Sequence, residues 1–309
     1  MTARALLLAR TARMTVYKNT LRTPVLSAAR AALARPELHA VSEIFSAAAQ
    51  EGFPGDPARA VAAAALYDDN AFTRALSRGE EAFLPDNVRE AALYDLETLE
   101  LLSRLTPADF ALDSPVPPPL WAPGEAPAPL SGHWGGNLSA LTEFYRKNGT
   151  GDFAKYRAFI WNGGLNAVKN PDPIRFCDLK GYERERGAVA GNIRRFLAGA
   201  PANNMLLYGD RGTGKSTTIH SLVNEFGDRG LRLVELSKNS LSRLSALSDL
   251  VKNQPLRFLL FIDDLTFSET DGDYAALKAV LEGSLETTPE NCLLCATSNR
   301  RHLIRESHG

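Results

Sequence analysis

Residues 209–216 place small and charged side chains at a spacing that suits the binding of phosphate groups. The stretch reads Gly-Asp-Arg-Gly-Thr-Gly-Lys-Ser and matches G-x-x-x-x-G-K-[ST] at every fixed position. Glycine permits positive φ and lets backbone N–H groups approach phosphate oxygens. Lys215 would then reach the β- and γ-phosphates of a nucleotide, and the Ser216 hydroxyl would bind magnesium. The alternative is a glycine-rich turn that binds no ligand.

The residues around this loop predict the geometry that such chemistry needs. The apolar run 204–208 predicts a strand that enters the loop, and residues 215–226 predict a helix that leaves it. The positive end of the helix dipole would then face the phosphates. The residues expected to contact a nucleotide here are Gly209, Asp210, Arg211, Gly212, Thr213, Gly214, Lys215, Ser216 and Thr217.

A second apolar run ends in two carboxylates. Residues 257–262 read Arg-Phe-Leu-Leu-Phe-Ile, and Asp263 and Asp264 follow directly. A buried strand that ends in acids is common by itself, but beside a phosphate loop it is typical of a magnesium-nucleotide site. We expect Asp263 to hold the metal through its water shell and Asp264 to polarise the attacking water.

A third apolar run, residues 293–299, ends in Thr-Ser-Asn. If this strand lies between the strand before the phosphate loop and the strand that ends at Asp263, Asn299 would lie beside the γ-phosphate. The alternative is an ordinary turn after a strand. The predicted catalytic residues are thus Asp264, Lys215 and Asn299, and the predicted metal ligands are Ser216 and Asp263.

The part of the chain that carries these runs alternates strands and helices, which predicts a parallel α/β sheet flanked by helices. The expected strands are 204–208, 231–236, 258–262 and 292–297, and the expected helices are 215–226, 241–252 and about 274–286. We assign this nucleotide-binding domain to residues 173–309.

The first half of the chain predicts a different organisation. Residues 1–112 are rich in Ala and Leu at helical spacing and predict a small all-helical domain. Residues 113–133 are dense in proline and predict a linker that forms the main domain boundary. Residues 134–172 mix aromatic and basic side chains, which indicates a connector packed onto its domain or, alternatively, a surface that stacks bases.

Composition limits the class of protein. The formal net charge of -1 provides no global attraction to nucleic acid or anionic lipid. No apolar run approaches the roughly 20 residues that span a bilayer, so we expect no membrane span and a cytoplasmic protein. The first 36 residues contain several Arg and Lys residues but neither Asp nor Glu, and Glu37 is the first acidic residue of the chain. This indicates a basic helical face, a basic arm for nucleic acid or a membrane surface, or a transit peptide.

The cysteines do not indicate a metal or redox site. Cys292 and Cys295 form a C-x-x-C pattern, but they lie in an apolar run that predicts a buried strand. Residues three apart on a strand point to opposite faces of the sheet. We therefore expect the two thiols to be separated.

Together, the loop, the acid-tipped strand and the Thr-Ser-Asn strand resemble the AAA+ superfamily, nearest to its helicase-loader and replication-initiator branch. Residues from about 140 to 305 resemble a bacterial family of AAA+ ATP-binding P-loop proteins of unknown function. The stretches that carry this resemblance are 170–173, 179–183, 201–209 and 296–303. It implies that Leu179, Gly181 and Tyr182 hold the adenine, which favours ATP. A GTPase would need an N-K-x-D motif, and the sequence has none.

Two departures from the AAA+ pattern affect the expected activity. Asp264 stands where most AAA+ proteins have the longer Glu, so we expect slow turnover. A complete AAA+ module would continue past Gly309 with a helix, a fifth strand that carries an arginine finger and a helical lid, so we expect either a fragment or an abbreviated fold. We do not expect Arg300 and Arg301 to act as arginine fingers.

The expected function is magnesium-dependent binding and slow hydrolysis of ATP by an AAA+ ATPase that acts on an unknown protein or nucleic-acid partner. The resemblance also implies a homo-oligomer in the full-length protein. One alternative is a nucleotide-gated binding or scaffold protein with little hydrolysis, and another is a nucleic-acid-associated loader. A small-molecule kinase has less support, because such enzymes usually need an arginine-rich lid and residues 265–290 contain no arginine.

Overall fold

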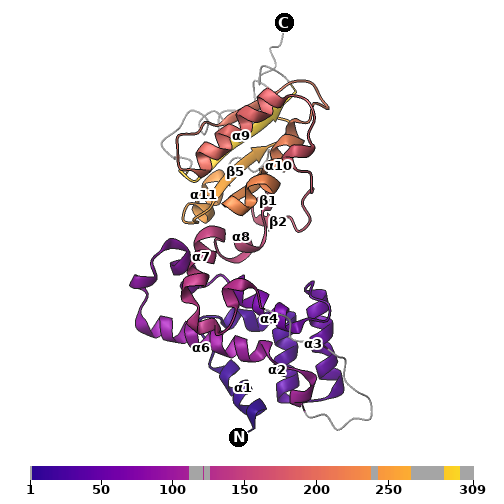
Figure 1. Ribbon diagram of the computed structural model, residues 1–309, viewed down its shortest axis with the longest axis vertical. Helices are drawn as coiled ribbons and strands as arrows, with labels where there is room; N and C mark the ends of the chain where they lie inside the picture. The colour runs from indigo at the N-terminus through magenta and orange to yellow at the C-terminus, as the bar shows by residue number, and fades with distance from the viewer. Residues whose placement is uncertain (1, 111–120, 122–125, 238–242, 266–288, 300–309) are drawn as a thin grey trace. The chain divides into compact units, whose positions relative to one another are not determined.

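The computed structural model divides the chain into two compact units, Met1–Arg146 and Lys147–Gly309, which are described separately below (Figure 1). The structure describes residues 2–110, 121, 126–237, 243–265 and 289–299. The helix expected at about 274–286 and the residues Arg300 and Arg301 lie outside this described part.

The first unit is built from α-helices, with short 3₁₀ helices between several of them. Its helices are α1 (Ala3–Ala12), α2 (Pro24–Ala34), α3 (Leu38–Gln50), α4 (Pro57–Leu66), α5 (Ala71–Arg78), α6 (Asp86–Ser103) and most of α7 (Leu138–Asn148). The 3₁₀ helices are Lys18–Arg22, Glu81–Phe83, Pro107–Phe110, Ala128–Leu130 and Trp134–Gly136.

Polar side chains define where these helices begin. Asp56 caps α4 by accepting the N–H of Arg59 at 2.9 Å. Asn70 and Thr73 form a reciprocal capping box at the start of α5. Gly79 ends α5 in the left-handed conformation with φ 74°, which is the usual way for glycine to terminate a helix.

One hydrophobic core holds this unit together. The side chains at helical spacing on α3 and α6 point into it, and they include Val41, Ile44, Leu96 and Leu99, all fully buried. The buried carboxylate of Asp95 orders the turn after α1 by accepting the N–H groups of residues 15, 16 and 17 at 2.7 to 3.0 Å. Burial raises the pKa of Asp95, although these three hydrogen bonds act to lower it.

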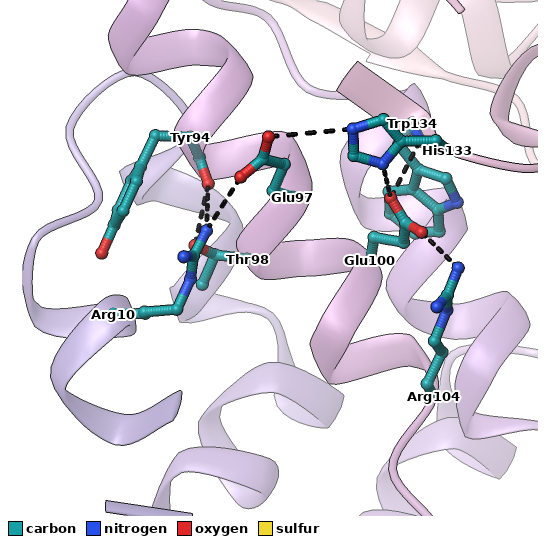
Figure 2. Close-up of polar contacts among 8 residues, drawn as sticks. All are labelled: Arg10, Tyr94, Glu97, Thr98, Glu100, Arg104, His133 and Trp134. Carbon is teal, nitrogen blue, oxygen red and sulfur yellow. Dashed lines mark hydrogen bonds and ion pairs between the residues drawn. The ribbon is translucent and has the colours of Figure 1, made fainter. Parts of the chain in front are cut away.

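The helical unit extends beyond the expected proline-rich boundary. Trp134, Leu141 and Tyr145 are buried in its core, so this part of the expected 134–172 connector packs with the helices. Figure 2 shows why: the buried carboxylate of Glu100 accepts the N–H of Trp134 at 2.9 Å and contacts His133 Nδ1 at 2.9 Å. The observed division falls at Arg146 rather than within residues 113–133, of which 113–120 and 122–125 are not described.

The second unit contains a six-stranded sheet in the order β2-β1-β4-β5-β6-β3. Every neighbouring pair is parallel except β1 with β2. The predicted parallel α/β fold is thus confirmed. The strands are β1 (Ala158–Trp161), β2 (Leu165–Ala167), β3 (Met205–Tyr208), β4 (Leu231–Leu236), β5 (Arg257–Ile262) and β6 (Cys292–Ser298).

Helices cover both faces of this sheet. Side chains from α9 (Glu183–Leu197) and α10 (Lys215–Phe226) pack on the face formed by Leu259, Phe261 and Cys295 (Figure 1). α11 (Leu244–Val251) packs on the opposite face, together with Cys292. The remaining elements are α8 (Gly151–Lys155) and the 3₁₀ helices Phe176–Asp178 and Gly227–Arg229.

The two thiols of the C-x-x-C pattern lie on opposite faces of β6, as their spacing predicted. Cys292 belongs to one core cluster and Cys295 to the other. Burial raises the pKa of each thiol to about 12. Within the described residues, no group of three or more His, Cys, Asp or Glu side chains is placed to hold a metal ion.

The strands β1 and β2 were not predicted, because residues 134–172 were interpreted as a connector. β1 has only four residues and its sequence is predominantly aromatic and aliphatic without alternation. β1 pairs with β4, which is more than 60 residues later in the sequence, and with β2, which follows after residues 162–164. These three residues read Asn-Gly-Gly, a local hairpin signal that was not used when the stretch was interpreted as a connector. The expected helix 241–252 is observed as Leu244–Val251, with residues 238–242 outside the described part.

A buried arginine of β4 forms hydrogen bonds with the backbone near the start of this unit. Arg232 of β4 donates hydrogen bonds to the carbonyl oxygens of Phe153, Gly227 and Leu231 at 2.8 to 3.0 Å. Burial lowers its pKa to about 10, and the neighbouring Arg157 acts in the same direction. The guanidinium therefore stays charged at neutral pH.

Helices long and apolar enough to cross a membrane are absent from the part of the chain that the structure describes.

The contacts of Glu100 predict a measurable contribution to the stability of the helical unit. Glu100→Ala should lower the free energy of unfolding by about 1–3 kcal/mol, because it leaves the buried N–H of Trp134 without its acceptor. Glu97→Ala on the same helix is the control. It removes the partly exposed contacts of Glu97 with Arg10 and His133 and should cost at most about 1 kcal/mol. Urea unfolding followed by circular dichroism measures both, and equal effects would contradict the prediction.

Candidate nucleotide site at the carboxyl ends of the strands

The predicted phosphate loop connects β3 to α10, as expected. Gly212 and Gly214 both have φ 79°, a conformation that residues with a Cβ rarely adopt. A Cβ built on either glycine would meet no other atom within 4 Å, so the positive φ rather than crowding explains the requirement for glycine. α10 begins at Lys215, and its first N–H groups therefore face the same space as the loop.

Lys215 folds its side chain into the loop. Its Nζ donates to the carbonyl oxygens of Gly209 at 2.9 Å and Asp210 at 2.8 Å. It also contacts Asn299 Oδ1 at 3.2 Å and, more weakly, Thr213 Oγ1 at 3.5 Å. The ammonium group is thereby held at the centre of the loop, between β3 and the end of β6.

The hydroxyl of Ser216 meets the first of the two predicted acids. Ser216 Oγ donates to Asp263 Oδ1 at 2.6 Å, although the two residues are 47 positions apart in the sequence. Burial acts to raise the pKa of Asp263, but hydrogen bonds from Ser216, Thr297 and the Asp264 N–H outweigh it, and the net pKa is lowered. Asp263 is therefore a carboxylate at neutral pH.

The second acid and the predicted end of β6 also come together. Asn299 Nδ2 donates to Asp264 Oδ1 at 2.7 Å, so Asn299 links Asp264 to Lys215. Asp264 has φ 48°, in the left-handed region that Asp tolerates better than most side chains. β6 lies between β3 and β5, which was the stated condition for Asn299 to lie beside the phosphate loop.

A groove runs from the loop along β3 and the facing side of α9. Its volume is about 720 Å³, and its lining includes Tyr182, Val189, Tyr208, Asp210 and Lys215. Tyr182 precedes α9 in the left-handed conformation, with φ 55°, and its side chain is 56% exposed. Bulky residues seldom adopt this conformation, which makes Tyr182 a point of backbone strain.

The structure thus places most, but not all, of the predicted site residues around one space. Lys215, Ser216, Asp263, Asp264 and Asn299 form one network of hydrogen bonds. Asp210, Thr213 and Gly209 line the groove, while Arg211 and Gly212 are exposed in the loop and Thr217 lies in the first turn of α10. Of the three residues expected at the adenine, Tyr182 lines the groove, whereas Leu179 and Gly181 are described residues outside its lining.

Two further residues belong to this region and were not predicted. The hydroxyl of Thr297 contacts both Asp263 and the N–H of Asp264. His220 follows Ser216 by one helical turn, packs edge-on against Phe261 and lies 3.6 Å from Glu235. The Thr297 contact follows from the register of β5 with β6, and the His220 contact depends on a partner on β4, so neither had a local signal in the sequence.

His220 predicts how the stability of this unit depends on pH. The Glu235 carboxylate raises the pKa of His220, against an opposing effect of burial. The pair should therefore stabilise the fold fully below about pH 6.5, and its contribution should disappear as the pH rises through the raised pKa. We expect Glu235→Gln to be less stable than the wild type in acid but not in alkali. Glu225→Gln, an exposed change on α10, is the control.

Thermal unfolding between pH 5 and pH 9 measures this difference. A gap between wild type and Glu235→Gln that stays constant over the whole range would contradict the assignment of the raised pKa to this pair.

Comparison with known proteins gives the chain a family. The model of a family described as a protein of unknown function, DUF815, matches residues 154–309. Two solved structures are similar at low identity. The crystal structure of DnaI has 22% identity and a TM-score of 0.31, with 41% of this chain and 69% of that chain covered. The AMPPCP-bound DnaA from Aquifex aeolicus has 20% identity and a TM-score of 0.29, with 41% of this chain and 42% of that chain covered.

No curated protein matches the chain in sequence. The predicted resemblance to a family of unknown function is confirmed by the family model, which spans just over half of the 309 residues. The chain belongs to the DUF815 family of proteins of unknown function.

Proposed function

We propose that this chain binds ATP together with magnesium and hydrolyses it slowly. The observation that carries the proposal is the contact between Ser216 and Asp263 at 2.6 Å, beside the loop that surrounds Lys215. A phosphate loop and an acid-tipped strand have this relation when a metal ion is shared between a protein hydroxyl, a carboxylate and phosphate oxygens.

The oxygen atoms at this point fit magnesium. Mg²⁺ prefers hard oxygen ligands and is usually held by one or two protein groups together with phosphates and water. Ser216 Oγ and Asp263 Oδ1 are such donors, and the lowered pKa of Asp263 keeps its carboxylate charged. In this proposal the two oxygens separate slightly to hold the ion or its water shell, and magnesium supplies charge neutralisation at the phosphates.

The lysine and the amides of the loop would bind the phosphates. Lys215 Nζ now contacts the carbonyl oxygens of Gly209 and Asp210, and a triphosphate would compete for the same ammonium group. The N–H groups at the start of α10 add the positive end of the helix dipole. The groove that continues past Asp210 to Tyr182 offers a place for the base of the nucleotide.

Hydrolysis would depend on Asp264 and Asn299. In this proposal Asp264 accepts a proton from the attacking water, and Asn299 orients Asp264 and contacts the γ-phosphate. The carboxylate of Asp264 is one methylene shorter than that of Glu, which supports slow rather than fast turnover. We also propose that the protein acts on a macromolecular partner and assembles with copies of itself, and these proposals rest only on the family resemblance.

Replacement of the lysine tests the binding part of the proposal. We expect Lys215→Ala to weaken the binding of magnesium-ATP by roughly 10- to 150-fold, because hydrogen bonds to a charged group contribute about 1.5–3 kcal/mol. Lys252→Ala is the matched control, since Lys252 lies at the end of α11 and contacts Asp249. Isothermal titration calorimetry measures both affinities. Unchanged affinity in Lys215→Ala would show that the site assignment is wrong.

Replacement of the second acid tests the hydrolytic part. Asp264→Asn keeps the shape of the side chain and tolerates the left-handed backbone, but it cannot accept a proton. We expect turnover to fall by roughly 10²- to 10⁴-fold while the affinity for magnesium-ATP changes by less than about threefold. Asp263→Asn should instead weaken the magnesium-dependent part of binding. If both variants lose binding equally, the two acids do not have separate roles.

A nucleotide-gated scaffold with little hydrolysis is the second candidate. The observation that favours it is the hydrogen bond between Asn299 and Asp264, which occupies the acid that hydrolysis needs. Steady turnover of the wild-type chain above roughly 1 per second, the low end of ordinary enzyme rates, would exclude this candidate.

A further inference from the structure

Thr297 is a buried polar residue next to both acids of the proposed site. It is the sixth of the seven residues of β6, and only 1% of its surface is exposed. Its hydroxyl oxygen Oγ1 donates to Asp263 Oδ1 and accepts the N–H of Asp264 at 2.9 Å. Its carbonyl oxygen accepts the N–H of Leu265 at 2.7 Å. One residue therefore contacts three consecutive residues of the segment that carries the acids.

The strand register explains why these contacts form. Phe261 lies opposite Cys295 and Ile262 opposite Ala296, so the next position brings Asp263 opposite Thr297. Side chains at alternate positions share a face of the sheet. Phe261 and Cys295 belong to the core cluster beneath α10, and Asp263 and Thr297 consequently meet on the side of the sheet where α10 begins.

The backbone at Asp264 needs this support. Its φ of 48° is a left-handed conformation that costs a residue with a Cβ roughly 1 kcal/mol or more. The N–H of Asp264 is held by Thr297 Oγ1 at 2.9 Å and Asp263 Oδ1 at 3.0 Å. The fully buried Leu265 then fixes the chain on the other side of Asp264. The Thr297 hydroxyl therefore helps to hold the backbone from which the Asp264 side chain projects.

We propose that Thr297 is a positioning residue that holds Asp264 in the orientation required for hydrolysis. This inference rests on the proposed ATP hydrolysis. The side chain of Thr297 does not itself touch the nucleotide; it acts through Asp264. A displacement of about 1 Å in a reacting group can slow a reaction roughly 100-fold, so a hydroxyl that fixes the backbone of Asp264 influences the rate more than the affinity.

Threonine is suited to this position because its hydroxyl both donates and accepts a hydrogen bond. Valine has nearly the same shape and the same preference for strands, but its methyl group can do neither. Serine keeps both hydrogen bonds and loses only the methyl group. In Thr297→Val, Asp263 still has the Ser216 hydroxyl and the Asp264 N–H as donors, so its proposed contact with the metal persists.

The test compares wild type, Thr297→Val and Thr297→Ser in two independent measurements. Steady-state kinetics with magnesium-ATP yield kcat and KM for each protein. Hydrogen exchange by NMR on the nucleotide-free protein reports the protection of the Asp264 amide. In Thr297→Val we expect kcat to fall at least about tenfold with KM changed less than about threefold. We also expect the Asp264 amide to exchange at least about tenfold faster.

Thr297→Ser should remain within about threefold of the wild type in both measurements, because it keeps the hydroxyl. If Thr297→Val does not fold, as judged by circular dichroism, Thr297→Ala takes its place, since it removes the same hydroxyl and adds no atom. A general packing defect would lower stability in both Thr297→Val and Thr297→Ser, and it would not separate kcat from KM.

The outcomes that overturn the inference differ from those that overturn the proposed function. Wild-type turnover together with an unchanged kcat in Thr297→Val would show that the hydroxyl does not position Asp264. An equal loss of kcat in Thr297→Ser would show the same, and so would unchanged exchange of the Asp264 amide. Absence of turnover in the wild type would overturn the proposed hydrolysis itself and, with it, this role of Thr297.

Discussion

The hydrogen bond between Ser216 and Asp263 is the interaction on which the geometry of the site depends. It joins the first turn of α10 to the residue that follows β5, across the end of β6, which lies between β3 and β5 in the sheet. With β6 between them, Asn299 and Thr297 project into the space between loop and acids. The parallel arrangement brings all these groups to the carboxyl edge, where ligands of such sheets bind.

The residues of the phosphate loop, of β5 and of β6 were predictable because each of these segments contains a short, contiguous sequence motif. The predicted first residue of α10 and the predicted last residue of β5 are the observed ones. A glycine-rich turn precedes the helix and two acids follow the strand, so both boundaries have a clear signal in the sequence. The role of Thr297 was not predictable, because it depends on which residue of β5 lies opposite. The strand β1 was missed partly for a similar reason, because its partner β4 is distant in the sequence, and partly because the Asn-Gly-Gly turn at residues 162–164 that joins it to β2 was not interpreted as a hairpin. Which residues of two distant strands lie opposite each other cannot be inferred from a local stretch of one sequence.

The helical unit shows the same limit. The helical spacing of Val41, Ile44, Leu96 and Leu99 indicated a core, and these side chains are buried together. The place where the unit ends was harder to predict, because the signal for a linker in residues 113–133 was compositional. Residues beyond the expected linker belong to this unit because Trp134, Leu141 and Tyr145 are buried in its core and the Glu100 carboxylate accepts the N–H of Trp134 across 34 positions. A buried carboxylate that accepts backbone N–H groups can hold a segment in the core even when the composition of that segment suggests a linker.

The phosphate loop follows a strand with exposed apolar side chains. Among the described strands, β3 pairs only with β6, and Leu206 and Tyr208 on it are 40% and 55% exposed. Both residues line the groove that runs from the phosphate loop, so their exposure leaves apolar and aromatic surface directly beside the loop. The hydrophobic effect would therefore favour a flat, largely apolar group over a fully hydrated one at this place in the groove.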